Sequence, residues 1–539
     1  MTEKLRPAEV GESRKRAKTR RTGRRLALFK ALVLVALSAL TVYGMLDSGL
    51  YREELWLPVA AGILGLLLVT LFVGGYYEDV SRGGWILVAI LAVLVGIKGL
   101  SLMWTISDKL TVLELLRSSM YLATFVLVLG ALSSSRQVSP LMDAAVLISA
   151  AVAGYGIMQK INPISYPATT PDATRIGSTL EYANTTAMIV GIGIVLGLAR
   201  MAEMKSPLAR GVYAALVVLF AMALYFTLSR GGIISLGAGL FTVFLLGGNR
   251  LQTFVNLSLI SAPMAWLVYS VQDLETLFRE NVTESQQLMN GASLRTDLLI
   301  AMAAAFLLQA VYAILVERYE LVPGARKILG VIVLVGVLLL GGVGGYLASD
   351  QLLAGSFSDA VTGRMQENES ANERLTSVSS NSRSQYWQVA WQEWKQHPFL
   401  GTGAGTFQFI WLEDRPGFGG VKQVHNVYLE QGTETGVFAF LALTGFAVLL
   451  VAYAVRSTWR SEPLGNRRII LSGLTGALVL YLFSSALEWH WYIPASTLIF
   501  FILAAIAVKL SAREDWTLEG NGEHQAYSQW NDKPDRNSL

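Results

Sequence analysis

The chain is dominated by long apolar runs separated by short polar segments. Fourteen such runs can be drawn, each near the ~20 residues that a helix needs to cross the hydrocarbon core of a membrane. They cover residues 26–46, 57–77, 85–104, 112–132, 140–158, 183–199, 209–228, 231–248, 253–271, 297–316, 328–347, 435–456, 469–487 and 493–509. Because lipid cannot satisfy unpaired backbone groups, each run predicts a helix. The expected fold is an all-α polytopic membrane protein with about 14 transmembrane helices, within a range of 12–14.

Composition agrees with this pattern and excludes other classes. Of the 539 residues, 53% are apolar and 15% are charged, whereas soluble domains carry about 25% charged residues. A soluble enzyme, a disordered chain and a disulfide-built secreted domain are therefore excluded. The chain has no cysteine and only four histidines, so a thiolate site is excluded and a zinc site is hard to assemble. Because no nucleotide-binding or HExxH motif is present either, we expect neither metal nor cofactor.

Basic residues predict the orientation. Arginines and lysines crowd residues 14–25, before the first run, and recur in the segments 200–210, 317–327 and 456–468. Cytoplasmic loops carry this excess of positive charge. We therefore expect a multi-pass protein of the cytoplasmic (inner) membrane with both termini cytoplasmic. A nucleic-acid partner explains the basic block less simply than membrane orientation does.

The spacing of the runs predicts five regions. A basic cytoplasmic tail (1–25) precedes a first membrane region of eleven spans (26–347), and an extracytoplasmic loop (348–434) separates these from three final spans (435–509) and a polar cytoplasmic tail (510–539). In the long loop, Ser382 or Ser384 can cap a helix that reaches Gln396 and places three tryptophans on one face. Tryptophan favours the membrane interface, so we expect this helix to lie along the outer surface. The following GTGAGTF segment is expected to be a flexible turn.

The predicted orientation places Arg175, Arg230, Arg383 and His425 on the outer side. Arg230 lies in SRGG, between two spans with almost no loop, where a guanidinium needs water or an anion as a partner. The helix that follows adds the positive end of its dipole. Several arginines on one membrane face suit a diphosphate, because guanidinium binds phosphate oxygens in pairs. Snorkelling toward lipid headgroups is the alternative for Arg230.

His425 is the candidate base, since histidine accepts protons near neutral pH. A structural role is the more common one for a lone histidine. Glu430 and Glu434 lie within one helical turn of each other, and either can orient a sugar or the histidine. Glu488 and His490 reach the same face between the last two spans.

Four motifs, taken together, resemble the superfamily of O-antigen ligases and O-antigen polymerases, which are bacterial envelope glycosyltransferases. Their order and spacing, and the long loop before the last spans, carry the resemblance. They are RIGSTLEYANTTA at 175–187, SRGG at 229–232, RSQYWQVAWQEWKQHPFLGTGAGTF at 383–407 and HNVYLEQGTETG at 425–436.

The resemblance implies a metal-independent, inverting glycosyltransferase that moves a glycan from an undecaprenyl-diphosphate carrier to an acceptor hydroxyl on the extracytoplasmic face. By this resemblance Arg230, Arg383 and His425 are the catalytic residues, and Arg175 joins the two arginines at the donor diphosphate. Arg175 and Asn184 match the same family pattern. The candidate acceptor or orienting residues are Asn426, Glu430, Glu434 and His490. The implied partners are the lipid-linked glycan, an acceptor on a glycan, lipid or protein, and membrane lipids.

Three alternatives stay open at this point. A polymerase would transfer the glycan to another lipid-linked repeat unit, whereas a ligase would transfer it to a finished acceptor. A transporter or flippase for lipid-linked sugars also suits fourteen spans, although no internal repeat is evident. An inactive envelope scaffold would leave Arg230, Arg383 and His425 freely replaceable.

Overall fold

The computed structural model describes residues 7–168, 174–279, 283–318, parts of 324–339, 383–416, 419–514 and 516, with side chains described from Gly23 onward. Every regular element in these ranges is helical, as the sequence predicts. The long apolar helices before the large loop are α1 (Pro7–Leu46), α2 (Glu53–Leu71), α3 (Arg82–Leu100), α4 (Asp108–Ala131), α5 (Val138–Ile161), α6 (Ala183–Glu203), α7 (Pro207–Thr227), α8 (Arg230–Leu246), α9 (Arg250–Gln272) and α10 (Glu284–Arg318).

The C-terminal part contributes five more helices, and short 3-10 turns join several elements. The helices are α14 (Arg383–Gln396), α15 (Phe407–Asp414), α16 (Val427–Arg460), α17 (Asn466–Ser485) and α18 (Pro494–Ala512). The 3-10 turns are η1 (Ser48–Leu50), η2 (Ser101–Met103), η3 (Ser135–Gln137), η4 (Ser178–Leu180), η5 (Glu275–Phe278) and η6 (His490–Tyr492).

Twelve helices in the described ranges are long and apolar enough to cross a membrane, which confirms the predicted polytopic fold. The two other predicted spans correspond to shorter helices, Arg230–Leu246 and Lys327–Gly336. α8 has 17 residues and is therefore about 26 Å long, slightly less than the ~30 Å hydrocarbon core. The first part of the predicted extracytoplasmic loop (348–382), together with nearly all of the C-terminal tail, lies outside the described residues.

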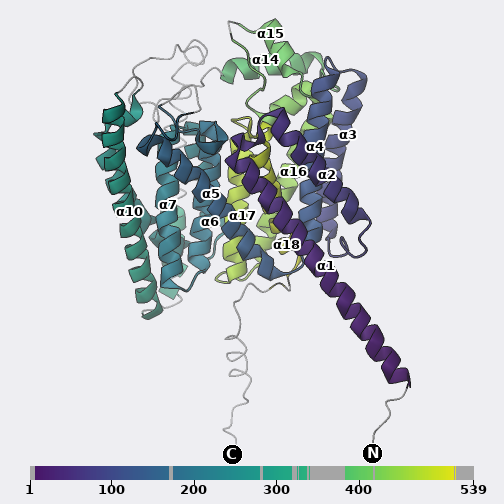
Figure 1. Ribbon diagram of the computed structural model, residues 1–539, viewed down its shortest axis with the longest axis horizontal. Helices are drawn as coiled ribbons and strands as arrows, with labels where there is room; N and C mark the ends of the chain where they lie inside the picture. Colours follow the sequence, from purple (N-terminus) through teal and green to yellow (C-terminus); the bar gives the residue numbers. More distant parts are fainter. Residues whose placement is uncertain are drawn as a thin grey trace, which may run out of the picture.

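The connections between helices alternate between two ends of the bundle. At one end, which we call the α14 end, Trp104 Nε1 donates to Leu400 O (3.1 Å). At the opposite end Arg468 Nε donates to Leu246 O (2.8 Å). In Figure 1 α14 and α15 lie across one end of the helices, and the N-terminal part of α1 projects from the other.

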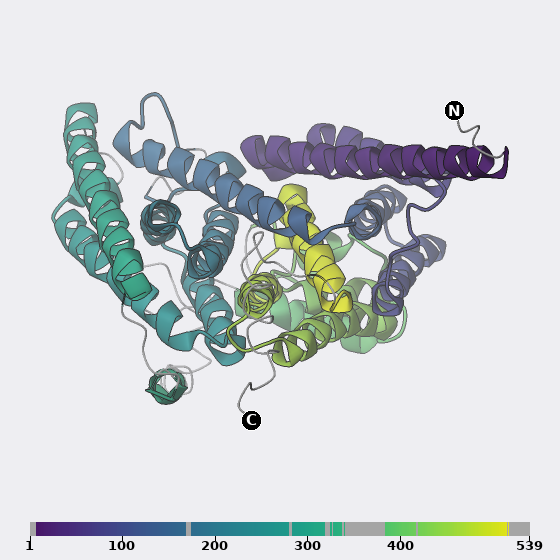
Figure 2. The same cartoon turned by 90° about the horizontal axis from the view of Figure 1, so that it is seen from below.

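Two helices form the centre of the bundle. In the most apolar stretch of α6 100% of the residues are buried, and in that of α18 94% are. Most other spans keep one face exposed. Seen along the bundle, α18 lies between the α2–α4 helices and the α5–α8 helices (Figure 2). The η6 turn that leads into α18 therefore enters the middle of the α14 end.

The segment after α14 is fixed to α16 rather than free. The Glu434 carboxylate accepts hydrogen bonds from the backbone N–H groups of Gly405 (2.7 Å) and Phe407 (3.1 Å), and Val437 N donates to Pro398 O (2.9 Å). Gly436 has a φ of 76°, and a Cβ there would overlap the backbone of residue 399. The expectation of a flexible GTGAGTF turn is therefore wrong, because buried side chains and glycine contacts hold it in place.

Candidate functional site

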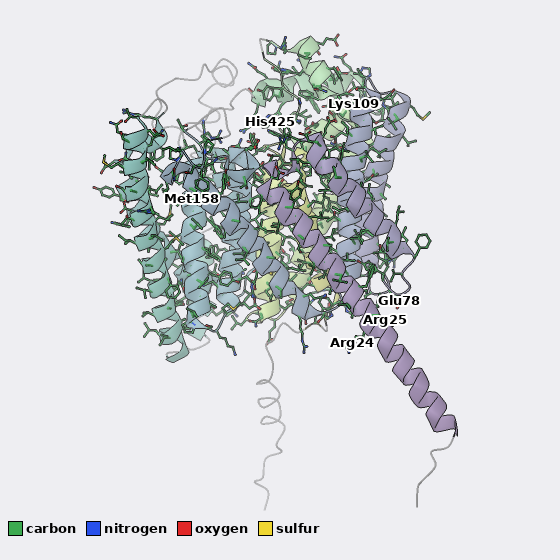
Figure 3. All side chains as sticks on the ribbon, viewed as in Figure 1. Arg24, Arg25, Glu78, Lys109, Met158 and His425 are labelled. Carbon is green, nitrogen blue, oxygen red and sulfur yellow. The ribbon has the colours of Figure 1, made fainter. Side chains whose placement is uncertain are left out.

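Five segments far apart in the sequence meet at the α14 end: the η4 region before α6, the α7–α8 turn, the start of α14, the start of α16 and the α17–η6 turn. Figure 3 places His425 at this end, and Arg24, Arg25 and Glu78 at the opposite end. The side chains that meet here, which we call the site cluster, are Arg175, Tyr182, Asn184, Arg383, His425 and Glu488.

Glu488 is the centre of the site cluster. Asn184 Nδ2 donates to its Oε1 (2.7 Å), and the Tyr182 hydroxyl donates to its Oε2 (2.6 Å). The Arg383 guanidinium forms an ion pair with Oε1, and His425 Nδ1 lies 3.4 Å from Oε2, at ion-pair distance but outside hydrogen-bond geometry. The Glu488 side chain is only 2% exposed. One buried carboxylate thus connects four other members of the cluster.

The neighbouring charges keep Glu488 ionised. Burial by itself would raise the pKa of this carboxyl. The Arg383 charge and the contact with His425 outweigh burial and lower the pKa of Glu488 from its ordinary 4.5 to about 2. Burial and the adjacent carboxylate raise the pKa of Tyr182, so this phenol stays protonated and donates. The cluster therefore carries a permanent negative charge beside an arginine and a histidine.

Arg175 is held by oxygen acceptors at the edge of the cluster. Its Nη2 donates to Asn184 Oδ1 (2.6 Å) and its Nε donates to the backbone oxygen of Thr227 (2.7 Å). The next residue, Ile176, donates its N–H to Phe226 O (3.1 Å). The loop before α6 is thereby tied to the end of α7, three residues before Arg230.

Arg230 is the first residue of α8. Ser229 caps this helix, its Oγ accepting from Gly232 N at 3.1 Å, which aims the positive end of the helix dipole at the α14 end. A Cβ added to Gly231 would lie 3.9 Å from Leu487, the residue before Glu488. The turn that carries Arg230 therefore lies beside the turn that carries the centre of the cluster.

His425 is held in an unusual backbone conformation. Its φ is 60°, in the left-handed region, which histidine enters more readily than bulkier residues. The next residue, Asn426, is the N-cap of α16, and its Oδ1 accepts from the N–H groups of Tyr428 and Leu429 (both 3.1 Å). The Tyr386 ring lies 5.5 Å from the His425 ring between centroids. The cap and the ring contact fix the imidazole at the entrance to α16.

The other candidate residues lie deeper. Glu430 is 1% exposed, and neither carboxylate oxygen has a hydrogen-bond partner among the described residues. Glu434 is committed to the backbone of the 405–407 turn. His490 is fully buried; Thr185 Oγ1 contacts its Nδ1 (2.9 Å) and Ser484 Oγ its Nε2 (2.7 Å). Burial lowers the pKa of His490 to about 4, so it is neutral at pH 7 and suits support of the α17–η6 turn.

The sequence reasoning missed one member of the cluster and undervalued another. Tyr182 stands inside RIGSTLEYANTTA but is not among the predicted site residues, and Glu488 is only placed on the same face as His490. Asn184 and Glu488 are 304 positions apart, so no local spacing links them. The sequence feature that could have identified Glu488 is its place between two spans, where an ionised carboxylate is energetically unfavourable unless it is paired.

Electrostatics at this end favour an anion. Arg175, Arg230 and Arg383 carry three positive charges against the one negative charge of Glu488 within the cluster and the adjoining turn. Arg383 Nε is a buried donor without a partner in the described part of the chain. An unpartnered guanidinium donor of this kind is a site for an oxyanion. Among the described residues there is no group of three or more His, Cys, Asp or Glu that could hold a metal ion.

The fold and the site together define a polytopic membrane protein with an arginine-rich, histidine-bearing site at one end of the bundle. A protein-family model described as O-antigen ligase matches residues 299–444. This match agrees with the predicted resemblance to the O-antigen ligase superfamily over the segment that it covers, which includes Arg383, His425 and Glu434. A membrane glycosyltransferase-type activity, as ligase or polymerase, is the function that this family supports. No curated protein matches the chain.

Proposed function

We propose that this protein is an O-antigen ligase-like glycosyltransferase that transfers a glycan from an undecaprenyl-diphosphate carrier to an acceptor hydroxyl on the extracytoplasmic face of the inner membrane. The observation that carries the proposal is the network around Glu488, which joins Arg175, Arg383 and His425 through Asn184 and direct contacts. A polymerase that joins lipid-linked repeat units would use the same chemistry.

The arginines are assigned to the donor diphosphate. A guanidinium stays charged at every relevant pH and pairs with phosphate oxygens through two parallel N–H groups. Arg383 supplies an Nε that has no partner among the described residues, beside its ion pair, and Arg175 is oriented by Asn184. Arg230 adds a charge at the N-terminus of α8, where the helix dipole also favours an anion. Positive charge of this kind stabilises the diphosphate most as it leaves with its extra negative charge.

His425 is assigned to the acceptor. The carboxylate beside Nδ1 favours the tautomer that carries its proton there, which leaves Nε2 free to accept one. In the proposed step the acceptor oxygen bonds to the anomeric carbon, and the bond from that carbon to the diphosphate breaks. Its electron pair stays on the diphosphate oxygen, and the hydroxyl proton moves to Nε2. A single displacement of this kind inverts the anomeric carbon. Glu488 is a positioning residue that holds the imidazole in this orientation.

The assignment of the site to the extracytoplasmic face rests on the distribution of positively charged residues between the two ends of the bundle. Arg24 and Arg25 lie at the end opposite to His425 (Figure 3), and Arg200 and Arg468 also belong to connections at that end. Because cytoplasmic ends of membrane proteins are enriched in arginine and lysine, the α14 end is assigned to the outside. No ATP is available there, so the donor has to arrive activated, as a lipid diphosphate does.

The experiment is the lipid-linked glycan profile of a strain that lacks this gene. Long glycans that accumulate on the carrier indicate a ligase, and single repeat units that accumulate while the polymer disappears indicate a polymerase. Complementation with Arg383→Ala should fail at normal protein abundance. The matched control is Arg415→Ala, in an arginine of the same loop whose Nη1 donates to Gly419 O. Donor confined to the cytoplasmic face would indicate a flippase and would overturn the proposal.

A further inference from the structure

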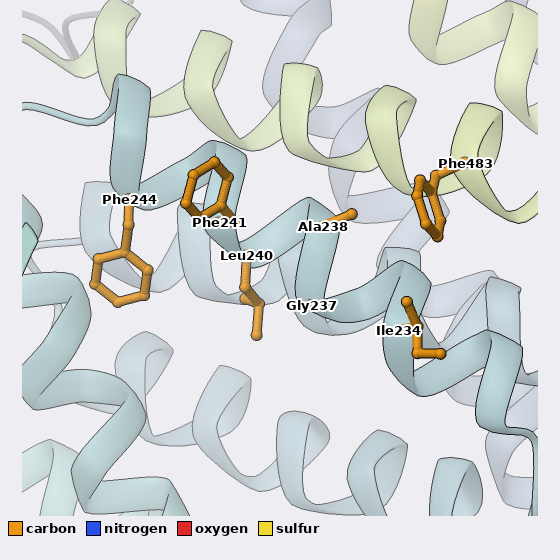
Figure 4. A pocket seen from close by; sticks show the side chains of 7 residues that line it. All are labelled: Ile234, Gly237, Ala238, Leu240, Phe241, Phe244 and Phe483. Carbon is orange, nitrogen blue, oxygen red and sulfur yellow. The ribbon is translucent and has the colours of Figure 1, made fainter. Parts of the chain in front are cut away.

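The exposed side of α8, facing away from the centre of the bundle, carries an apolar groove that the proposed chemistry does not use. It has a volume of about 400 Å³, within the range of small-molecule pockets. Its lining has no charged or polar side chain and comes from α8 and α17: Ile234, Gly237, Ala238, Leu240, Phe241, Phe244 and Phe483. Figure 4 shows five of these side chains along α8, with Phe483 on the neighbouring helix.

The groove shares a helical stripe with Arg230. Residues 234, 237, 241 and 244 follow Arg230 at intervals of four, three, four and three, which keeps all of them on one face of a helix. The opposite wall leads to the same site, because Phe483 lies on α17 five residues before Glu488. Both walls therefore run from the apolar surface to the cluster that we assign to the diphosphate.

The floor of the groove is open at Gly237. A Cβ added to this residue would meet no described heavy atom within 4 Å, while Ile234 and Phe241 on either side are 56% and 39% exposed. On the other face of α8, Gly239 approaches Gly476 of α17 so closely that a Cβ would lie 3.0 Å from its backbone oxygen. Small residues thus draw the two helices together, and larger ones form the walls on the membrane side.

We infer that this groove holds the polyprenyl chain of a lipid diphosphate donor, an inference that rests on the proposed function. An amphiphile with a diphosphate head needs cationic groups at one end and a purely apolar channel continuous with them, which the stripe from Arg230 to Phe244 provides. Along the axis of α8 this stripe is about 21 Å long. One leaflet of the hydrocarbon core is only about 15 Å deep, so the stripe suits a chain longer than an ordinary acyl chain.

The test compares two donors with the same glycan diphosphate head, one on a long polyprenyl chain and one on a short geranyl chain. Gly237→Phe places an aromatic ring in the groove, at a position where the added Cβ meets no described heavy atom within 4 Å. It should raise KM for the long-chain donor about tenfold, as expected if about two methylene groups lose their contacts. KM for the geranyl donor should not change. The control is Gly62→Phe in α2, an exposed mid-helix glycine whose added Cβ also meets nothing within 4 Å.

Equal effects of Gly237→Phe on both donors, or an unchanged KM for the long-chain donor, would overturn the inference. If the wild-type protein transfers glycan from neither donor, the proposed function fails instead. The groove is then tested by a sugar-free polyprenyl diphosphate with a diazirine in its tail. Crosslinking to peptides that contain residues 234–244 supports the groove, and equally strong crosslinking by a diazirine phospholipid refutes the assignment to a polyprenyl chain.

Discussion

Glu488 offers the sharpest perturbation of the site, because Glu488→Gln removes the charge and the acceptor of the Tyr182 hydroxyl while the side chain keeps its size. Glu488→Gln keeps the shape of the side chain, and its amide oxygen can still accept from Asn184. It removes the negative charge that pairs with Arg383 and lies beside His425. The matched substitution Glu488→Asp keeps the charge but shortens the side chain.

The expected loss of stability follows from the pKa. The folded protein lowers the pKa of Glu488 from 4.5 to about 2, which corresponds to about 3 kcal/mol in favour of the ionised form at neutral pH. A neutral glutamine forfeits roughly this amount. The figure agrees with the ~3–5 kcal/mol lost when one partner of a buried ion pair is removed. The pKa of Glu488 is lower in the folded protein than in the unfolded chain, so its ionised form stabilises the fold at neutral pH. This advantage of the wild type over Glu488→Gln should disappear as the pH falls from about 4.5 to 2.

The assay is glycan transfer by the purified protein, with kcat and KM measured separately and protein abundance and melting temperature recorded. Loss of an oriented base costs about 10²–10⁴ in rate. We therefore expect Glu488→Gln to lower kcat by at least ~10²-fold, with a smaller change in the donor KM, and Glu488→Asp to recover part of kcat. The control is Glu53→Gln, which breaks an exposed ion pair with Lys109 at the same end of the bundle. A variant that melts lower yet keeps kcat within about threefold would refute the positioning role.

Further predictions concern the support of the site and its orientation. His490→Gln should flatten the pH dependence of stability, measured by denaturation curves at pH 7 and 4.5. In the wild type the pKa of His490 is about 4, below the ordinary 6.5, so between pH 6.5 and 4 only the unfolded chain gains this proton. The wild-type fold should therefore lose up to about 3 kcal/mol over that range. Glu434→Gln should release the 405–407 turn, which the Glu434 carboxylate holds through two backbone N–H groups. We expect the free energy of unfolding to fall by about 2–4 kcal/mol. Faster hydrogen exchange in this turn would show the release, and unchanged exchange would contradict it. In this cysteine-free chain, Lys109→Cys should react with an impermeant thiol reagent from outside the cell. Arg136→Cys, which is exposed at the other end of the bundle, should react only after permeabilisation. The reverse pattern would invert the topology.

Much of the fold could be predicted because lipid imposes one dominant rule. Helices had to satisfy their own backbone groups, so long apolar runs located the spans, and the helix that ends at Gln396 was also expected. α16 begins at Val427, before the predicted span of 435–456, and its helical backbone is interrupted at Gly436, close to the predicted start of that span. The polar residues Glu430 and Glu434 broke the apolar run, and only the folded chain shows that backbone N–H groups satisfy Glu434.

The site was predictable in part, for a related reason. Arg230 drew attention because a charge in a loopless turn is costly, and this argument needs only local sequence. The role of Glu488 was not accessible in this way, because its partners come from segments up to 306 residues away. The fixed conformation of the segment from Pro398 to Phe407 was hidden as well. Its glycines indicated freedom, while the observed contacts show that they allow close approach to α16.

The most direct measurement of the central claim is transfer by the purified protein in vesicles, with an undecaprenyl-diphosphate glycan as donor and a saccharide acceptor added outside. The account predicts a product with one new glycosidic bond of inverted anomeric configuration and one released undecaprenyl diphosphate for each transfer. It also predicts that Arg383→Ala and His425→Ala abolish both. Retained anomeric configuration, or full activity of either variant, would contradict the account.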